Sequence, residues 1–319
     1  MSRTGIGIIG TGAIAAVHGP TATSLSDTRL VASLSRQEST AKEFLVRLGA
    51  QDARPYTDLA AFVADPAVDL VIVASPDKVH FSHAQACLRA GKHVLLEKPM
   101  TVSVSEAQAL VDLAEASRLV LATGYHLRSH AGHKELLSRL RNGDIGTIRH
   151  IRAMWSWPQK DDSNWRARDE VGKWWSLAGV GTHCLDLARW FTGYTGDWAQ
   201  FRAVLSNSVW HGPHDETAII AAQLPTGTTV EVTSSVQFDT YHRVEIFGER
   251  GIAVCHGTLG HDGAGEIQVN GQRLDFTPVN PFAAQLTAVL GAIAGSGRPP
   301  ADGRVGLRGV KDLLLASDA

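Results

Sequence analysis

Short apolar runs alternate with amphipathic stretches along the first 123 residues of the chain. The apolar runs predict strands at residues 5–9, 29–35, 70–74, 93–97 and 119–123. Between them, apolar positions recur at helical spacing, as in residues 14–26 and 80–90. A continuous apolar run is typical of a parallel strand covered on both faces, and alternation of strands with helices is typical of a doubly wound sheet. The pattern therefore predicts an α/β domain at residues 1–123.

Two further segments carry signals for the start of a helix. Thr40-x-x-Glu43 and Ser103-x-x-Glu106 match the capping box. In this motif the first side chain accepts a hydrogen bond from a backbone N–H of the first turn. We expect helices to begin at these two positions.

From residue 147 onward, strand-like segments follow one another with few helices between them. Strands are predicted at residues 148–157, 200–209, 217–224, 228–235 and 244–247, and helices at 131–142, 281–294 and 305–316. Pro225-Thr226-Gly227-Thr228 has the composition of a hairpin turn. Consecutive strands predict a largely antiparallel sheet, open on one face, in an α+β domain at residues 124–319.

The composition narrows the choice of partners. Lys and Arg number 30 against 32 Asp and Glu, so the 319-residue chain has a formal net charge of -2 and lacks the basic footprint of a nucleic-acid-binding protein. No apolar run reaches the length of a membrane span. The three cysteines lie far apart, which fits a reducing compartment and gives no metal-ligand spacing. Because the first strand leaves no room for a signal peptide, we expect a cytoplasmic protein. From the charge balance, the apolar runs and the cysteine spacing, we expect no nucleic-acid partner, no membrane and no metal.

The first strand runs into Gly10-x-Gly12-x-x-Ala15, where a helix can begin. Gly10 allows a tight turn, and Gly12 has no Cβ, so a pyrophosphate can approach the backbone. Small Ala15 lets the helix pack closely on the strand, and the free N–H groups of the helix start attract phosphates. An ordinary glycine turn is the alternative. The position between a strand and a helix favours dinucleotide binding.

The end of the second predicted strand bears on the choice of nicotinamide cofactor. An acidic residue there accepts hydrogen bonds from the adenosine ribose 2′-hydroxyl in proteins that bind NAD. In this chain the strand ends in Ser35-Arg36, without an acid. A hydroxyl followed by a guanidinium can bind a 2′-phosphate with charge assistance, which favours NADP(H). The alternative is a solvated loop arginine.

The next notable element is Glu97-Lys98-Pro99 at the end of a predicted strand. Ligands of doubly wound sheets bind beyond the carboxyl ends of the strands, so Lys98 can reach a nicotinamide and a substrate hydroxyl. Pro99 disfavours helix at the residue before it. Without further context, an exposed charge pair at a strand end is the simpler interpretation.

Several motifs occur in a linked order along nearly the whole chain. They are Gly10-x-Gly12-x-x-Ala15, Ala74-Ser75-Pro76 followed by His80, Gly91-Lys92-His93-Val94 leading into Glu97-Lys98-Pro99, Gly143-x-Ile145-Gly146, Asn164-Trp165-Arg166, Gly181-x-His183-x-x-Asp186, Phe247-Gly248-x-x-Gly251 and Asn280-Pro281-Phe282. In these motifs the chain resembles the glucose–fructose oxidoreductase / inositol dehydrogenase family (Gfo/Idh/MocA). The resemblance implies a Rossmann domain, a second α+β domain with an open sheet, and NAD(P)-dependent redox chemistry on sugars, cyclitols and related alcohols or ketones.

The resemblance also implies roles for individual residues. Lys98 stands where the family has its catalytic lysine, and Ser75 and Pro76 stand where the family contacts the cofactor. The residues that we assign to cofactor binding are Gly10, Thr11, Gly12, Ala13, Ile14, Ser35, Arg36, Ser75, Pro76, His80, Glu97 and Lys98.

The chain departs from the family's pattern in the second domain. The family commonly has Asp and His four residues apart, on one helical face. Aligning on Gly181-x-His183 places Gly179 where that Asp is expected. His183 remains and can act as an acid or base near neutral pH. Asp186 can orient the His183 ring, or the helix can bury it in a cap or an ion pair.

Candidate substrate residues come from this segment and from the stretch after residue 124. They are Tyr125, His126, Arg128, Trp155, Trp165, Arg166, Trp175 and Asp186. A hinge between the domains is the alternative for the first three. Core packing explains any single tryptophan of this region, whereas several together can form an apolar or sugar-stacking surface.

These observations predict an NADP(H)-preferring oxidoreductase, with NAD(H) as the alternative cofactor. It would transfer a hydride between the nicotinamide and a carbinol or carbonyl carbon of a sugar, cyclitol or related polyol, with Lys98 and His183 as catalytic residues. One rival is a non-catalytic dinucleotide-binding sensor or regulator, which Gly179 favours. Another is a structural interaction protein. The open sheet predicts a homodimer or homotetramer.

Overall fold

A computed structural model describes residues 3–239 and 242–318 of the chain. Its contacts form two compact units, Met1–Gly124 with Phe282–Val310, and Tyr125–Pro281 with Lys311–Ala319. The sequence pattern assigned everything after residue 123 to the second domain. In the structure Phe282–Val310 instead belong to the first unit, because Leu286 and Val289 are fully buried in its hydrophobic core.

The first unit is built on a six-stranded sheet in the order β3-β2-β1-β4-β5-β6, with all neighbouring strands parallel. The strands are β1 (Thr4–Ile9), β2 (Thr28–Leu34), β3 (Arg54–Tyr56), β4 (Leu70–Val73), β5 (His93–Leu96) and β6 (Leu121–Thr123). Every residue of β4 is buried, as expected for a strand covered on both faces. This order defines the Rossmann fold and confirms the predicted doubly wound sheet.

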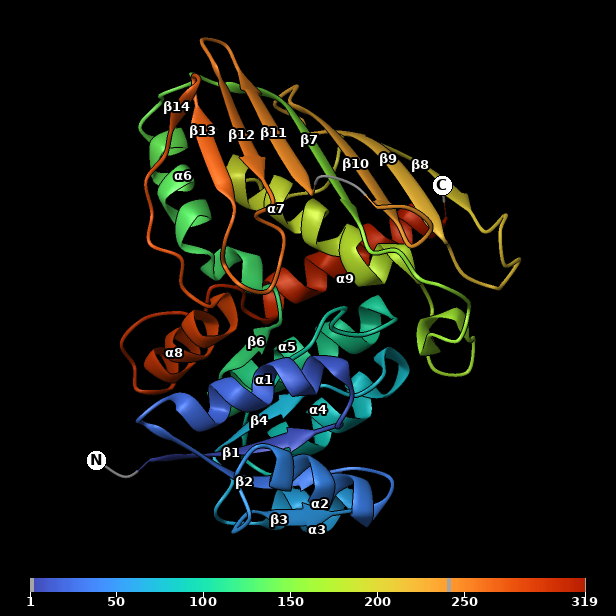
Figure 1. The fold of residues 1–319 in the computed structure, drawn as a ribbon, viewed down its shortest axis with the longest axis vertical. Helices are drawn as coiled ribbons and strands as arrows, with labels where there is room; N and C mark the ends of the chain where they lie inside the picture. The colour runs from blue at the N-terminus through green and yellow to red at the C-terminus, as the bar shows by residue number, and fades with distance from the viewer. Residues whose placement is uncertain (1–2, 240–241, 319) are drawn as a thin grey trace. The chain divides into compact units, whose positions relative to one another are not determined.

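Helices lie on both sides of this sheet (Figure 1). They are α1 (Ala13–Ser24), α2 (Glu38–Arg47), α3 (Leu59–Ala64), α4 (His80–Arg89), α5 (Val104–Ser117) and α8 (Pro281–Ile293), with a 3-10 turn at Asp77–Val79 before α4. Ile6 and Ile8 of β1 pack in one core cluster with residues of α1, α2 and α8. A Cβ at Gly7, which points to the opposite face, would meet the ring of Phe62 in α3.

Neither predicted capping box is formed. Helix α2 begins at Glu38, two residues before Thr40, and Gln37 takes the capping position without a side-chain bond. Ser103 does precede α5, but its hydroxyl hydrogen-bonds the Ser105 hydroxyl instead of a backbone N–H. The Ser103 motif therefore predicted where α5 begins, although the hydrogen bonds of the capping box are absent at both sites.

The second unit is built on an eight-stranded sheet in the order β14-β13-β12-β11-β7-β10-β9-β8. The strands are β7 (Ile148–Ser156), β8 (Gln200–Ser206), β9 (Thr217–Gln223), β10 (Thr229–Ser235), β11 (Arg243–Gly248), β12 (Ile252–His256), β13 (Glu266–Val269) and β14 (Gln272–Arg273). The central strands β7 and β10 pair in parallel, and the other neighbouring strands pair antiparallel. The predicted mostly antiparallel sheet is confirmed, including the hairpin turn at Gly227, whose φ is +89°.

The π-helical turn at Leu177–Gly181 and α7 (Thr182–Thr192) contact this sheet. The other helical segments of the unit are the 3-10 turn His126–Ser129, α6 (Ala131–Arg141), a second 3-10 turn at Trp165–Ala167 and the end of α9 (Gly303–Ser317). Helix α7 packs on β7 and β10. The edge strand β8 and its neighbour β9 leave apolar side chains exposed, namely Val204, Leu205 and Ile219.

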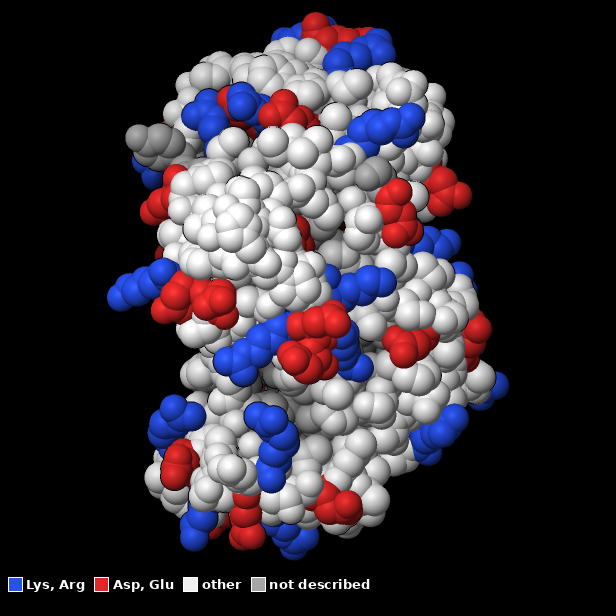
Figure 2. Space-filling view, turned by 90° about the vertical axis from the view of Figure 1, so that its right-hand side faces the viewer, with Lys and Arg blue, Asp and Glu red and all other residues white. Residues whose placement is uncertain are grey.

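Basic and acidic side chains are interspersed on the face drawn in Figure 2, with uncharged areas between them. Neither sign of charge gathers into a broad field there among the described residues. No helix of the described chain combines the length and the apolar character that a membrane span requires.

Candidate active site

The turn after β1 has the geometry that the glycine motif predicts. Gly10 has a φ of +95°, and a Cβ there would lie 2.5 Å from the carbonyl oxygen of Ala74. Helix α1 begins directly after Gly12, and no atom lies within 4 Å of the point where a Gly12 Cβ would stand. The backbone at the start of α1 is therefore open to a phosphate group, and its N–H groups can donate to it.

The predicted ribose pocket lies at the carboxyl end of β2. Ser35 directly follows this strand, is half-buried, and donates its backbone N–H to the carbonyl oxygen of Tyr56 at 3.1 Å. Arg36 is exposed. Their contact with a 2′-phosphate stays a prediction.

The charge pair after β5 is buried, so the interpretation as an exposed strand end is wrong. Glu97 is 4% exposed and Lys98 is 9% exposed. One oxygen of the Glu97 carboxylate lies 2.7 Å from Nε2 of His18 in α1, and the other accepts the Lys98 backbone N–H at 3.2 Å. A Cβ at Gly124 would lie within 3.0 Å of this carboxylate, so glycine is needed to make room for it.

His80, at the start of α4, holds the neighbouring backbone together. It is 1% exposed, and its ring nitrogens lie 2.8 Å from the carbonyl oxygens of Ser75 and Pro99. The hydroxyl of Ser75 in turn contacts Nδ1 of His83 at 2.9 Å. Burial, and then the nearby charge of His80, lower the pKa of His83 to about 4, so His83 is neutral at physiological pH.

In the second unit, His183 lies in the first turn of α7 and is 2% exposed. Its ring is surrounded by three of the predicted substrate residues. The ring centroids are 4.9 Å from His126, 5.3 Å from Trp155 and 5.7 Å from Tyr125. The Tyr125 hydroxyl contacts the Thr182 hydroxyl at 2.7 Å, and burial raises the pKa of Tyr125, so the phenol stays protonated.

Gly179 lies in the π-helical turn that precedes α7. A Cβ at this position would meet a single neighbour, a ring carbon of Trp157 at 3.8 Å, which is an ordinary contact distance. Trp157 itself is 43% exposed. A Cβ is therefore accommodated at the position where the family commonly carries its Asp.

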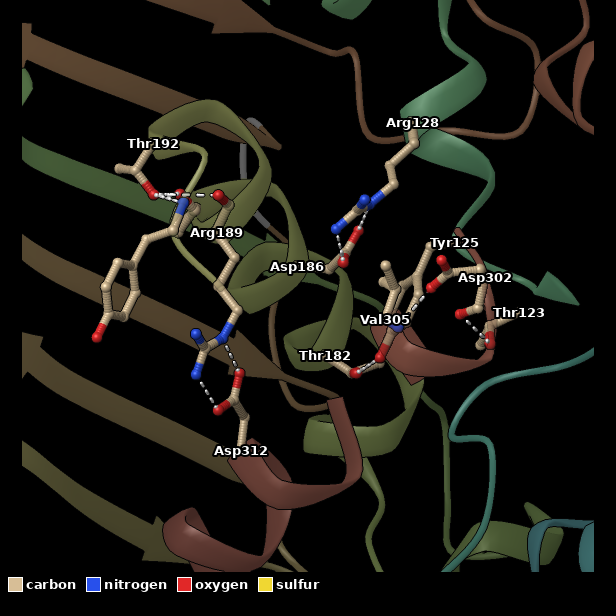
Figure 3. Close-up of polar contacts among 12 residues, drawn as sticks. Thr123, Tyr125, Arg128, Thr182, Asp186, Arg189, Thr192, Asp302, Val305 and Asp312 are labelled. Atoms are coloured by element: carbon tan, nitrogen blue, oxygen red, sulfur yellow. Dashed lines mark hydrogen bonds and ion pairs between the residues drawn. The ribbon is translucent and has the colours of Figure 1, made fainter. Parts of the chain in front are cut away.

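Of the alternatives predicted for Asp186, the structure shows the buried ion pair. Its two oxygens accept hydrogen bonds from Nε and Nη2 of Arg128 at 2.8 and 2.7 Å, and both side chains are buried (Figure 3). One turn further along α7, Arg189 makes a similar paired contact with Asp312. These two ion pairs hold α7 against the 3-10 turn at His126–Ser129 and against the end of α9.

The remaining tryptophan and arginine candidates make separate ring contacts. Trp175 is 2% exposed and packs against Trp210 at 5.1 Å, so core packing accounts for it. The Arg166 guanidinium stacks on the Trp165 ring at 4.1 Å within their own 3-10 turn.

Sequence reasoning missed three histidines near these groups. They are His18, which contacts Glu97, the exposed His261, whose ring lies 5.5 Å from His126, and His242, whose ring lies 5.9 Å from Trp155. His18 carries a weak signal, because it lies one turn after Ala15 on the helix that follows the glycine turn. The other two come from loops that carry no motif.

The cysteines have no part in this chemistry. Cys87, Cys184 and Cys255 are buried, and burial raises the pKa of each thiol to about 12, which keeps it protonated. The described residues contain no group of three or more His, Cys, Asp or Glu side chains that could hold a metal ion.

A Rossmann sheet, an open glycine turn and a buried lysine beyond β5 define the class of dinucleotide-dependent oxidoreductases. The chain belongs to the GFO/IDH/MocA family. The family model described as "Oxidoreductase family, NAD-binding Rossmann fold" matches residues 4–125, and that of the "GFO/IDH/MocA C-terminal domain" matches residues 133–254. This confirms the resemblance inferred from the motifs and the prediction of an NAD(P)-dependent oxidoreductase.

Relatives and solved structures agree with this assignment. The chain is 29% identical over 300 residues to an uncharacterized oxidoreductase of Synechocystis, covering 88% of this chain and 78% of the relative. It is 25% identical over 250 residues to myo-inositol 2-dehydrogenase of Thermotoga maritima, covering 77% and 73% of the two chains. Aldose–aldose oxidoreductase of Caulobacter crescentus shares the fold, with a TM-score of 0.89, 24% identity, and 99% and 97% of the chains covered.

Proposed function

We propose that this protein is an NADP(H)-preferring oxidoreductase of a sugar, a cyclitol or a related polyol. The observation that carries the proposal is Lys98, a buried cation beyond the carboxyl end of β5, beside a Glu97 carboxylate that His18 holds in place. A lysine in this position is suited to an oxygen that gains negative charge during reaction, because its ammonium can donate to that oxygen.

The residues present fit a nicotinamide dinucleotide. The glycine turn and the start of α1 would hold the pyrophosphate, and Ser35 and Arg36 would hold the ribose 2′-phosphate. When bound, the nicotinamide supplies the site for hydride transfer at its C4 atom. The preference for NADP(H) over NAD(H) rests on the hydroxyl and guanidinium that follow β2.

The protein's own side chains would handle the proton and the charge. In the oxidation direction, His183 takes the proton of the substrate hydroxyl while the carbonyl forms, and the Lys98 cation stabilises the developing alkoxide. The alternative is that Lys98 enters the step as the neutral amine and takes this proton itself. In reduction the same groups return the proton. Tyr125, His126 and Trp155 surround His183 and are the residues that we assign to substrate contact in the second unit.

Steady-state kinetics on a panel of sugars, cyclitols and keto-sugars with NADP(H) and NAD(H) tests the proposal. Lys98→Met keeps much of the stem but removes the cation, and should lower kcat/KM by about a hundredfold or more. His183→Asn keeps a polar group but does not titrate, and should lower it by about a hundred- to ten-thousandfold. Fluorescence titration should show that NADPH affinity changes little in the His183 variant.

Two outcomes would contradict this assignment. Near-normal turnover by His183→Asn would remove His183 from the proton path and leave Lys98 with that role. Tight cofactor binding without turnover on any member of the panel would favour the dinucleotide-binding sensor, the rival that Gly179 favours.

We also propose that the second unit forms a homodimer or homotetramer through the outer face of its sheet. Val204 is 66% exposed and Ile219 is 48% exposed, on neighbouring strands. Apolar side chains in this position are typical of an interface between subunits. Sedimentation velocity should show an oligomer at micromolar concentration, and a monomer alone would refute this assembly.

A further inference from the structure

His80 makes two hydrogen bonds that together span the ends of two parallel strands. Ser75 lies just beyond β4, and Pro99 lies just beyond β5. The two ring nitrogens of His80 lie 2.8 Å from the carbonyl oxygens of these residues. The ring itself is buried and comes from a third element, the first residue of α4.

The chemistry of the two acceptors determines the protons on this ring. A carbonyl oxygen can accept a hydrogen bond but cannot donate one, so each ring nitrogen must carry a proton for both contacts to be hydrogen bonds. Only the imidazolium form of histidine meets this requirement. Hydrogen bonds from a charged donor are also stronger than neutral ones, so the ring is well suited to hold the two backbone segments together.

The backbone on either side of Lys98 is held by a hydrogen bond that involves a neighbouring residue. On one side, the Glu97 carboxylate contacts His18 and accepts the backbone N–H of Lys98. On the other side, His80 bonds to the carbonyl of Pro99, the residue that follows Lys98. The backbone that carries the Lys98 side chain is thus held at the residue before it and at the residue after it.

We propose that His80 is a positioning residue for Lys98, acting as a doubly donating imidazolium that ties the Pro99 carbonyl to the Ser75 carbonyl. This rests on the proposed function, in which the Lys98 ammonium meets the reacting oxygen. A displacement of about 1 Å at such a group can cost about a hundredfold in rate, so the support matters for turnover more than for binding. His80 then acts through the backbone and does not itself contact cofactor or substrate.

His80→Gln is the variant that tests the proposal, because its single amide group cannot reach both carbonyls. We expect kcat to fall about tenfold or more, with the KM for the cofactor changed less than about threefold. His93→Gln is the matched control. His93 lies at the other end of β5, where its Nδ1 accepts the Val120 backbone N–H, and its replacement should leave kcat within about twofold.

A double-mutant cycle separates positioning from a general structural role. If His80 acts through Lys98, adding His80→Gln to Lys98→Met should lower single-turnover hydride transfer by less than about threefold. Full additivity of the two substitutions would overturn the proposal. A weaker cofactor affinity with unchanged kcat in His80→Gln would also overturn it, and would favour the predicted direct role of His80 in cofactor binding.

Nitrogen-15 NMR on histidine-labelled, unsubstituted protein gives a test that needs neither turnover nor a folded variant. Both ring nitrogens of His80 should carry a proton in the folded protein, with similar nitrogen shifts. An unprotonated ring nitrogen would refute the proposal that His80 donates a hydrogen bond to each of the two carbonyl groups. If Lys98→Met keeps full turnover, the proposed catalysis fails by itself, and the NMR result still decides whether His80 joins the two strand ends as described.

Discussion

The ion pair between Arg128 and Asp186 allows a prediction that distinguishes a structural role from a catalytic one. Asp186 lies three residues after His183 on α7, so the sequence left open whether its carboxylate orients the His183 ring. In the structure both carboxylate oxygens accept hydrogen bonds from Arg128, and the two side chains are 6% and 10% exposed. We therefore expect Asp186→Asn to destabilise the fold and to leave the chemistry of the folded enzyme nearly intact.

The structure sets the size of this effect. Replacing Asp186 with Asn removes the negative charge that Nε and Nη2 of the buried Arg128 contact. Breaking a buried pair from one side costs about 3–5 kcal/mol, and we expect about 3 kcal/mol because the amide oxygen can still accept one hydrogen bond. For a unit of this size, about 2–4 °C per kcal/mol gives a decrease in Tm of about 6–12 °C.

Differential scanning calorimetry and kinetics on the folded fraction are the assays. Glu249→Gln is the control, because its ion pair with Arg149 is exposed and should contribute little to Tm. Replacing both partners, as Arg128→Met with Asp186→Leu, should recover much of the lost stability, since no charge is then buried alone. A hundredfold loss of kcat with an unchanged Tm would refute the structural role and favour the alternative in which Asp186 orients the His183 ring.

Three further predictions concern the ribose pocket, Gly179 and His133. Ser35→Asp combined with Arg36→Ala should weaken NADPH binding by about ten- to a hundredfold in fluorescence titrations and NADH binding much less; equal weakening of both would refute the ribose-pocket assignment. Gly179→Asp should fold normally, since a Cβ there meets its nearest neighbour at 3.8 Å, and should move the acidic limb of the pH–rate profile to higher pH; an unmoved limb would argue against a titrating His183 beside it. Burial, and then the charge of His130, lower the pKa of His133 to about 3. His133 is thus neutral in the folded protein at pH values where the unfolded chain already binds a proton, so stability should fall as the pH drops from about 6.5 toward 3, and His133→Gln should reduce this slope in urea titrations.

The amino-acid sequence alone determined the class of both sheets, parallel in the first unit and mostly antiparallel in the second. Apolar runs of four to six residues between amphipathic segments are sufficient to predict a parallel sheet. A strand that is covered on both faces buries all of its side chains, so it lacks the alternating polar positions of a half-exposed strand. The glycine turn was equally predictable, since Gly10 adopts a backbone conformation that other residues rarely take. The placement of α8 was not, because its apolar face could pack on either unit, and only the tertiary contacts of Leu286 decided it.

For the site, sequence motifs selected the residues, and the tertiary structure decided how they are held. The motif named Glu97, Lys98 and His80. Burial of the charge pair and its contact with His18, 79 positions earlier in the chain, depend on the tertiary structure, which brings α1 to the residue after β5. The same holds for Asp186, whose partner comes from a turn 58 positions away. Hydrogen bonds between residues so far apart in the chain are determined by packing geometry, which periodicity and local propensity do not encode. Strands, turns and short motifs depend instead on neighbours within a few residues, so the sequence alone can predict them.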